Sequence, residues 1–452
     1  MSNAPRTRLA ISQETPRLET ANGCPGSIAS PLMNLTSSPL EDRPLSRRTL
    51  LAGVPALAVA LTACSSSSSG ATASSASATA TSTASADGPA AAGSVAALAQ
   101  AFYQTLDADL KAKVLLDYTL ASAKRWSNLP QGLLSGGGGA PGGAAPGGAA
   151  PGGAQPSGGG ALPSGGAGQP TGGFAGGPGG SNQSRVGITL GDLKAEQLTA
   201  LTALLKAATG TASGLGYDEI EQQLNADDYL NTHGGGDSYG RANYYVAILG
   251  SPQDSGTWEF QFGGHHLAVA NTYTDGKLAG ATPSFRGVEP FTAFTLNGKS
   301  NQPLKVKYTA FAAMLDALSA EQLAGAKLSD VYSDLVLGPG KDWAFPAKRE
   351  GVKLSTVSAQ QKKLALAAIA TYVDDIADGD AATILARYEK ELDETCLSWS
   401  GTKALTAQND YARIDGPSVW IEFSMQHGIV LSGNHPHSVW RDRTSDYGGT
   451  KS

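Results

Sequence analysis

Cysteine is scarce in this chain, which restricts the covalent and metal chemistry open to it. The 452 residues contain only Cys24, Cys64 and Cys396. Once an export leader is removed and Cys64 is lipidated, as residues 43–64 indicate, Cys396 stands alone. An intramolecular disulfide, a cysteine-based zinc knuckle and an iron–sulfur cluster are therefore excluded. With only four methionines as well, the chain has few of the soft ligands that Cu(I) carriers often use, which argues against such a carrier.

Charge and long apolar runs are also in short supply. Charged residues make up 16% of the chain, the formal net charge is −6, and the lysines and arginines are scattered. This distribution excludes electrostatic binding of nucleic acid. No apolar run reaches the 18 residues that a membrane-spanning helix requires, so we expect no transmembrane helix in the mature protein.

The first 63 residues are typical of a signal peptide. Arg47 and Arg48 precede an apolar stretch, residues 50–63, that is too short to span a membrane. Ser46 and the two arginines resemble a twin-arginine export signal, although the usual Phe and Lys are absent, so the general secretory route stays open. The turn-rich residues before this point make Met33 an alternative start.

Leu61-Thr62-Ala63-Cys64 closes the apolar stretch and resembles a bacterial lipobox. Cleavage before Cys64 and acylation of its thiol would anchor the protein in the membrane. Residues 64–92, rich in Ser and Ala, are typical of a flexible tether. We therefore expect a lipid-anchored protein on the extracytoplasmic face of the bacterial cell membrane.

Glycine is abundant, with 57 residues in the chain, and 23 of these fall between residues 131 and 180. Residues 131–182 carry APGGA repeats, which are costly to order and offer little to bury, so we expect a disordered loop. Collagen is excluded because Gly does not occupy every third position. We expect residues 93–452 to form a single domain that this loop interrupts.

The hydrophobic periodicity outside this loop changes along the chain between that of helices and that of strands. Helical spacing predicts helices over residues 95–118, 189–208, 217–230, 308–318, 358–376 and 381–396, with a capping box at Ser358 and Gln361. Alternation and turn signals predict strands over residues 244–249, 257–262, 266–273, 277–281, 411–414, 418–423, 428–431 and 437–440. This order predicts an α+β fold, in which a helical N-terminal part packs with a mainly antiparallel sheet from two separated hairpin regions.

Several strings, in order along the chain, resemble one bacterial family, catalogued as domain of unknown function family 3500. The resemblance extends over residues 95–449, apart from the Gly-rich loop, and implies an exported protein without assigning an activity. The strings include Phe262-Gly-Gly-His-His-Leu267, Thr282-Pro-Ser-Phe-Arg-Gly-Val-Glu-Pro290, Arg413-Ile-Asp-Gly-Pro-Ser-Val-Trp-Ile-Glu422 and His435-Pro-His-Ser-Val-Trp-Arg-Asp442.

Histidine supplies the strongest candidates for chemistry. His435 and His437 are two residues apart, so a strand would point both imidazoles to one face, and Pro436 between them indicates an edge strand. His265 and His266 are adjacent, so in a strand they would point to opposite faces. One of them could complete a site for Zn, Cu, Fe or Ni, while the other would make a supporting hydrogen bond. The alternative is a cluster of buried, hydrogen-bonded histidines.

Three further residues are candidates for a catalytic role beside such a metal. Arg441 and Asp442 follow the second histidine pair, where the carboxylate could act as a general base or could form a surface ion pair with the arginine. Glu289 precedes a proline, which favours an extended conformation in a loop over residues 285–290, and could be a ligand or base.

We therefore expect a membrane-tethered lipoprotein with a histidine-based metal site, which could be a metalloenzyme. The alternative is a non-catalytic binding or scaffold lipoprotein of the cell envelope. The substrate stays unassigned.

Overall fold

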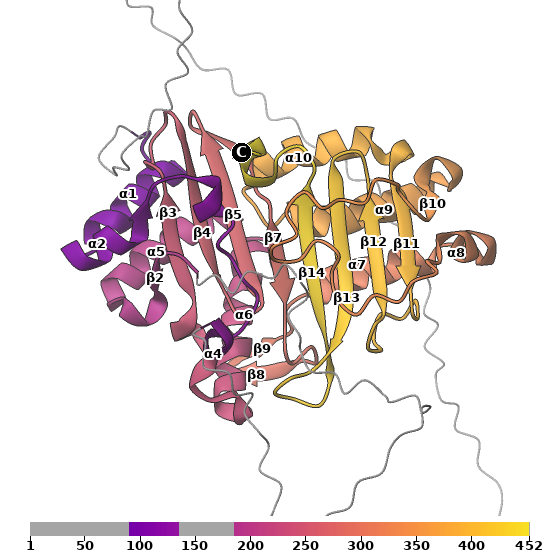
Figure 1. The fold of residues 1–452 in the computed structure, drawn as a ribbon, viewed down its shortest axis with the longest axis horizontal. Helices are drawn as coiled ribbons and strands as arrows, with labels where there is room; N and C mark the ends of the chain where they lie inside the picture. Colours follow the sequence, from indigo (N-terminus) through magenta and orange to yellow (C-terminus); the bar gives the residue numbers. More distant parts are fainter. Residues whose placement is uncertain (1–89, 135–184, 452) are drawn as a thin grey trace, which may run out of the picture. The chain divides into compact units, whose positions relative to one another are not determined.

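The computed structural model describes residues 90–134 and 185–451 (Figure 1). All of these residues belong to one compact unit, Ala78–Ser452. The predicted signal peptide, most of the tether with Cys64, and nearly all of the Gly-rich segment lie outside the described residues. The first residues of that segment, Gln131–Leu134, form a short helix, α4.

A sheet of twelve strands organises the described chain. The strands are β1 (Leu115–Leu116), β2 (Ile188–Thr189), β3 (Tyr245–Leu249), β4 (Thr257–Gly264), β5 (Leu267–Thr274), β6 (Lys277–Gly280), β7 (Ser284–Gly287), β10 (Val352–Lys353), β11 (Cys396–Ser400), β12 (Tyr411–Asp415), β13 (Val419–His427) and β14 (Asn434–Asp442). Their order is β1-β3-β4-β5-β7-β14-β13-β12-β11-β10, while β2 pairs with β3 and β6 with β5. A separate hairpin consists of β8 (Phe294–Leu296) and β9 (Lys299–Asn301).

Every named strand pair is antiparallel except β1 with β3. The sheet has two halves, one built from the region before residue 281 and one from the region after residue 351. Strand β7 joins them, because Phe285 pairs with Ala268 of β5 on one side and with Val439 of β14 on the other. The predicted assembly of the sheet from two separated hairpin regions is confirmed, and the fold is α+β.

Ten α-helices accompany the sheet in the described residues. They are α1 (Val95–Thr105), α2 (Ala108–Val114), α3 (Leu120–Ala123), α4, α5 (Ala195–Thr209), α6 (Gly216–Leu230), α7 (Lys305–Asp316), α8 (Ala320–Ala326), α9 (Ala359–Val373) and α10 (Asp378–Lys390). Ser358 and Gln361 form the predicted capping box at the start of α9. None of these helices is long and apolar enough to cross a membrane.

Two apolar cores hold the helices against the two halves of the sheet. Phe102 of α1 and Leu204 of α5 belong to the core that includes Phe260 of β4. Phe311 of α7 belongs to the other core, with Phe423 of β13. The side chains that make these contacts are fully buried, so both cores contribute hydrophobic stabilisation.

The opposite face of the sheet is covered by irregular chain. Phe285 and Val439 point to this face, where they pack against Trp126, between α3 and α4, and Leu335, between α8 and β10. Arg286, next to Phe285, points to the helical face and contacts Glu219 of α6.

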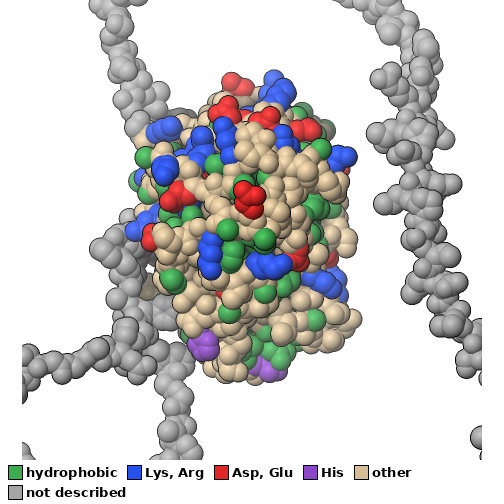
Figure 2. Space-filling model, turned by 90° about the vertical axis from the view of Figure 1, so that its right-hand side faces the viewer, with side chains coloured by type: hydrophobic (Ala, Val, Ile, Leu, Met, Phe, Trp, Pro, Cys, Tyr) green, Lys and Arg blue, Asp and Glu red, His purple; other side chains and the backbone are tan. Residues whose placement is uncertain are grey.

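On the surface that Figure 2 shows, basic and acidic side chains lie interspersed.

Several local predictions are wrong. The predicted helix over residues 95–118 is interrupted after α1. Asp107 is the N-cap of a second helix, α2, and its side chain accepts a hydrogen bond from the backbone N–H of Leu110. Residues 428–431, predicted as a strand, lie in the connection between β13 and β14. Residues 285–287, part of the predicted loop over residues 285–290, belong to β7. Strand β11 was not predicted.

Strand β14 is not at an edge, because it lies between β13 and β7. The carbonyl of Pro436 faces β7, because it accepts a hydrogen bond from Val288, just beyond the end of that strand. In an antiparallel pair, the N and O atoms of one residue face the same neighbouring strand. The N–H that proline lacks would therefore point to a position where the β7 ladder has already ended, and Pro436 is tolerated there.

Candidate metal centre

Three histidines from the two halves of the sheet meet at a single point. The Nε2 atom of His437 lies 3.3 Å from Nε2 of His435 and 3.2 Å from Nε2 of His266. One nitrogen from each ring lies within 4.8 Å of the others. The chain separation of 171 residues between His266 and His437 shows that tertiary structure brings these rings together.

Strand β14 positions two of the three rings. Because side chains alternate along a strand, His435 and His437 share the loop-covered face with Val439. Ser438, in between, faces the helices, where its hydroxyl lies 2.6 Å from that of Tyr372 of α9. The spacing of two residues therefore places both imidazoles on one face, as the sequence predicts.

A tight turn between β4 and β5 positions the third ring. Gly264 pairs with Leu267, so His265 and His266 are the two central residues of the turn, and His266 has a positive φ of 62°. The His266 backbone is held on both sides, since its N–H donates to Asn128 and its carbonyl accepts from Gly287. The prediction that the two adjacent rings point to opposite faces is wrong: in the turn they stack, with centroids 3.7 Å apart.

Two glycines leave room for this arrangement. A Cβ atom on Gly264 would lie 2.6 Å from the ring of Tyr244, closer than any real Cβ contact. A Cβ atom on Gly287 would lie 3.1 Å from His266 and 3.2 Å from His437, so a side chain there would press on both rings. The absence of a side chain at Gly287 lets the imidazoles approach each other, and its absence at Gly264 leaves room for Tyr244 beside the turn.

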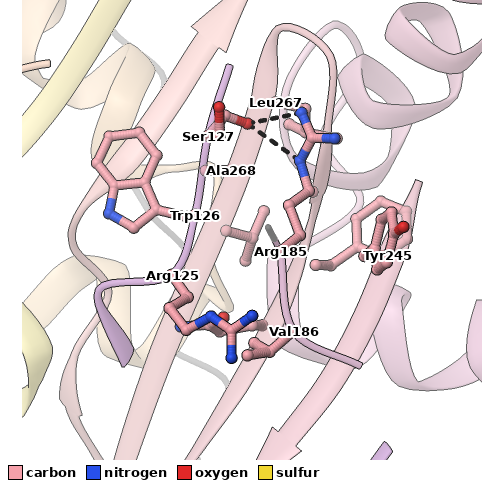
Figure 3. A pocket seen from close by; sticks show the side chains of 12 residues that line it. Arg125, Trp126, Ser127, Arg185, Val186, Tyr245, Leu267 and Ala268 are labelled. Carbon is pink, nitrogen blue, oxygen red and sulfur yellow. Dashed lines mark hydrogen bonds between the residues drawn. The ribbon is translucent and has the colours of Figure 1, made fainter. Parts of the chain in front are cut away.

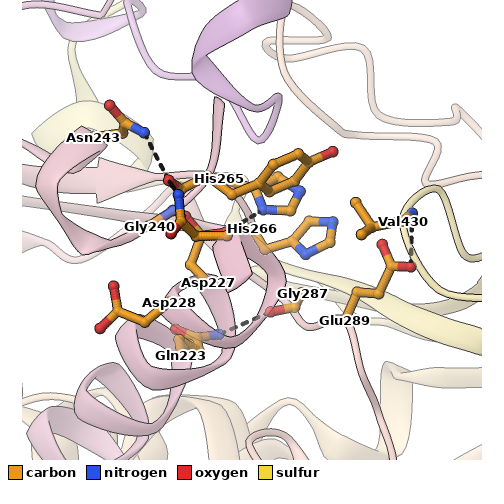
Figure 4. A network of polar contacts seen from close by, with 12 residues as sticks. Gln223, Asp227, Asp228, Gly240, Asn243, His265, His266, Gly287, Glu289 and Val430 are labelled. Atoms are coloured by element: carbon orange, nitrogen blue, oxygen red, sulfur yellow. Dashed lines mark hydrogen bonds and ion pairs between the residues drawn. The ribbon is translucent and has the colours of Figure 1, made fainter. Parts of the chain in front are cut away.

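His265 does not join the three converging nitrogens but supports His266 from behind (Figure 4). Its Nδ1 atom lies 2.6 Å from a carboxylate oxygen of Asp227 in α6, and Asp227 also accepts a hydrogen bond from Gly240. The ring of Tyr239 packs edge-on against His265 at 4.9 Å. One member of the adjacent pair thus enters the cluster, and the other makes a supporting hydrogen bond.

A carboxylate from a distant loop orients His437. Nδ1 of His437 lies 3.1 Å from Oδ1 of Asp334, in the loop between α8 and β10. A metal-binding imidazole commonly donates its second N–H to such a carboxylate. Sequence reasoning missed Asp334, and no spacing or motif links it to the histidines.

Burial sets the electrostatics of the cluster. His435 is 1% exposed, His266 5% and His437 8%. Burial, together with the neighbouring histidines, holds the pKa values of His266 and His435 well below 6.5. Both rings are therefore neutral at physiological pH, and neutral imidazole is the form that binds a metal. Nδ1 of His435 is buried without a hydrogen-bond partner among the described residues.

Arg441 and Asp442 lie further along β14, away from the cluster. Asp442 is about 16 Å beyond His437 at 3.3 Å per residue, and it accepts hydrogen bonds from Arg387 and from Tyr388, 2.5 Å away. Arg441 is fully buried and donates to Asp446 at 2.7 Å. Neither residue is at the surface, and their partners assign both to a separate network that holds the end of the sheet.

Glu289 is committed to the loop that leads into β14. Its carboxylate accepts hydrogen bonds from the backbone of Ile429, Val430 and Leu431, at 3.3, 3.0 and 2.6 Å (Figure 4). These bonds fix the turn after β13 and thereby the start of the strand that carries His435. The observed contacts of Glu289 are those of an anchoring residue.

A model of the family described as "Protein of unknown function (DUF3500)" matches residues 180–449. The matched region is more than half of the chain and contains all three converging histidines, as well as His265 and Asp334. No curated protein and no solved structure matches the chain.

Proposed function

The chain belongs to the DUF3500 family of proteins of unknown function, and we propose that it binds one divalent transition-metal ion on His266, His435 and His437. One observation carries this proposal: Nε2 of His437 lies within 3.3 Å of two other imidazole nitrogens. If Nδ1 of His437 donates to Asp334, its Nε2 has a single lone pair, which is poorly suited to two ring neighbours. A cation at the meeting point would satisfy all three nitrogens at once.

The nitrogen spacing fits a small metal ion. Ligand nitrogens 2.0–2.1 Å from a tetrahedral Zn²⁺ are about 3.3–3.4 Å apart. The Nε2 atom of His437 lies 3.2 and 3.3 Å from the other two Nε2 atoms, close to that value. Neutral imidazole suits Zn, Cu, Fe and Ni, and three protein ligands leave a coordination position for another group. Bound there, a metal would supply Lewis acidity, which makes a metalloenzyme the function that this site supports best.

Access to the centre bears on the choice between catalysis and structural support. All three ligands are at most 8% exposed, whereas the Asp334 side chain is 55% exposed. A substrate would therefore approach beside Asp334. The rival proposal is a non-catalytic binding or scaffold protein, in which the cluster cross-links the two halves of the sheet.

The metal proposal is tested by elemental analysis of the full chain, purified after export from its native host. We expect one equivalent of metal in the wild type and none in His435→Ala or His437→Ala. His233→Gln is the matched control, since His233 is exposed and outside the cluster. Chelation should lower the Tm of the wild type and the control only, because a ligand bound to the folded state stabilises it.

Two results would count against the metal site. One is a wild type without metal whose Tm is unaffected by added Zn²⁺ or by chelation. The other is retention of the metal in both histidine variants. Either result would leave the cluster as a hydrogen-bonded histidine network and would favour the scaffold function.

We further propose that the protein acts at the outer face of the membrane, held by a lipid on Cys64. The support is the Leu61–Cys64 motif with the Ser-rich residues that follow it. Cys64→Ala should release the protein from the membrane fraction or block its processing, whereas Cys396→Ala should not. Unchanged membrane association of the Cys64 variant would contradict lipidation.

A further inference from the structure

The peptide group between His265 and His266 is held by hydrogen bonds at both of its polar atoms. Its carbonyl oxygen, which belongs to His265, accepts a bond of 2.5 Å from the hydroxyl of Tyr244. Its N–H, which belongs to His266, donates to the carbonyl of Asn128 at 3.1 Å. The plane of this peptide therefore cannot rotate without the loss of a hydrogen bond.

The backbone of His266 requires this restraint. Its φ of 62° lies in the left-handed region, which is uncommon for residues other than glycine and persists only where the surrounding contacts impose it. A change in φ would turn the imidazole relative to the preceding peptide. Because a metal ligand must be held within about 0.5 Å of its productive position, the contacts that fix this peptide also fix Nε2 of His266 beside Nε2 of His437.

Arg185 holds the segment that supplies the acceptor for His266. Its guanidinium donates to the carbonyl of Ser127 through Nε at 3.2 Å and through Nη2 at 2.9 Å (Figure 3). Nη2 also donates to the carbonyl of Leu129. These two residues precede and follow Asn128 in the chain. The arginine therefore fixes the backbone on both sides of the carbonyl to which His266 donates.

The charge of Arg185 links it to the same turn by a second route. Arg185 is 8% exposed, and burial lowers its pKa to about 10, although the charge of the neighbouring Asp227 opposes this shift. The guanidinium therefore stays charged at neutral pH. Asp227 is also the carboxylate that lies 2.6 Å from Nδ1 of His265, whose ring stacks on that of His266. One carboxylate thus faces both the buried cation and the supporting ring.

We propose that Arg185 is a positioning residue of the metal centre, which holds the carbonyl of Asn128 where it keeps His266 in its metal-binding orientation. This inference rests on the proposed metal site, because Arg185 acts on a ligand of that site and not on the metal itself. Asn128 precedes the Gly-rich segment and Arg185 follows it. The orientation of His266 therefore depends on a contact between two parts of the chain that this segment separates.

Hydrogen–deuterium exchange of the full chain tests this role without reference to a metal. In the peptide that spans residues 263–267, we expect Arg185→Gln and Arg185→Lys to exchange about tenfold faster than the wild type, while exchange over residues 419–427 of β13 stays unchanged. Arg185→Lys keeps the charge, but its ammonium lacks the planar fork that reaches both carbonyls. Arg443→Gln is the matched control and should exchange as the wild type does over residues 263–267. Arg443 likewise donates to a carbonyl, that of Gly416, but it lies near the other half of the sheet.

Competition with a chromogenic chelator then shows whether the metal responds to Arg185. We expect both Arg185 variants to bind Zn²⁺ about tenfold more weakly, as loss of a supporting contact typically does. The absorption spectrum of the Co²⁺-loaded variants should also change, because a displaced His266 alters the ligand set. Arg443→Gln should match the wild type in both measurements. A wild type that takes up no metal would contradict the metal site alone, since the exchange of residues 263–267 would still decide the role of Arg185.

Three results would overturn the positioning role. The first is equal exchange of residues 263–267 in the wild type and the Arg185 variants. The second is faster exchange throughout the chain, which would assign Arg185 to general stability. The third is faster exchange of the turn with unchanged Zn²⁺ affinity and an unchanged Co²⁺ spectrum. If Arg185→Gln does not fold, Arg185→Lys decides the result, because it retains a cation beside Asp227.

Discussion

At the scale of single residues, the buried histidines divide into three that converge and one that supports them. His265 and His266 are adjacent and both buried. The Nδ1 atom of His265 contacts Asp227, and His265 does not join the converging group. Asp334 makes the corresponding contact with His437. Both of these rings have a carboxylate at Nδ1, but only His437 belongs to the converging group, so the position of each ring in the fold sets its role.

Replacement of Asp334 should weaken the proposed metal site without unfolding the protein. We expect Asp334→Asn to lower metal affinity on the order of tenfold, because the amide loses the charge that increases the basicity of His437. Competition with a chromogenic chelator measures this affinity. Asp330→Asn, in the same exposed loop, is the control and should bind as the wild type does. Equal affinity of the Asp334 and Asp330 variants would show that the Asp334 contact is incidental.

Glu259 should make stability depend on pH. Burial raises its pKa to about 7, although Gln261 and Thr272 donate hydrogen bonds to its carboxylate. A carboxyl with a raised folded-state pKa stabilises most when protonated, so this contribution is present below about pH 4.5 and is lost as the pH rises to 7. The free energy of unfolding of Glu259→Gln, compared with that of the wild type, should therefore be more favourable at pH 8 than at pH 4.5, by up to about 3 kcal/mol.

Urea denaturation of Glu259→Gln and wild type at both pH values measures this difference. Other titrating groups are common to the two proteins and cancel in the comparison. A difference in the free energy of unfolding that is the same at pH 4.5 and pH 8 would show that Glu259 is ionised normally.

At the scale of elements, β7 is the strand on which the architecture depends. It is four residues long, yet it pairs with both halves of the sheet and presents Gly287 to the histidine cluster. On its helical face, Arg286 enters a buried group of four charges with Glu219, Lys307 and Asp375. Helices α6 and α7 are thereby tied to the strand that joins the halves.

Replacement of one charged side chain in this group should lower the free energy of unfolding. Lys307 is fully buried and lies 2.6 Å from Glu219 and 3.0 Å from Asp375, so Lys307→Met leaves two carboxylates with one arginine. We expect a loss of about 3–5 kcal/mol in the free energy of unfolding, measured by urea denaturation. Lys305→Met, exposed on the same helix, should change it by less than about 0.5 kcal/mol. Comparable stability of the two variants would refute a structural role for the buried charges.

At the scale of the whole molecule, the Gly-rich segment leaves and re-enters the domain at one place. Arg185, just after the segment, bonds the carbonyls of Ser127 and Leu129, just before it. These contacts hold together the two described ends of the chain on either side of the insertion. We therefore expect the domain to fold with or without the residues between these two ends.

Deletion of residues 136–180 should leave the Tm nearly unchanged. The composition offers little to bury, and loop closure costs only about 0.6 kcal/mol for each doubling of loop length. Calorimetry of the deletion variant beside the full chain measures the effect. A fall of more than about 5 °C would show that the deleted residues pack against the domain.

The sequence by itself determined the local features of this protein. Alternation and turn residues in the hairpins, helical spacing, and the two-residue interval between His435 and His437 act over a few positions, so they can be read from neighbours in the chain. Tertiary structure decided the rest. Strand β7 has no distinctive pattern and exists because β5 and β14 both need a partner. The orientation of His266 follows from a turn that β4 and β5 close together, and Asp334 reaches His437 from 103 residues away. Such contacts depend on long-range packing, which no local spacing specifies.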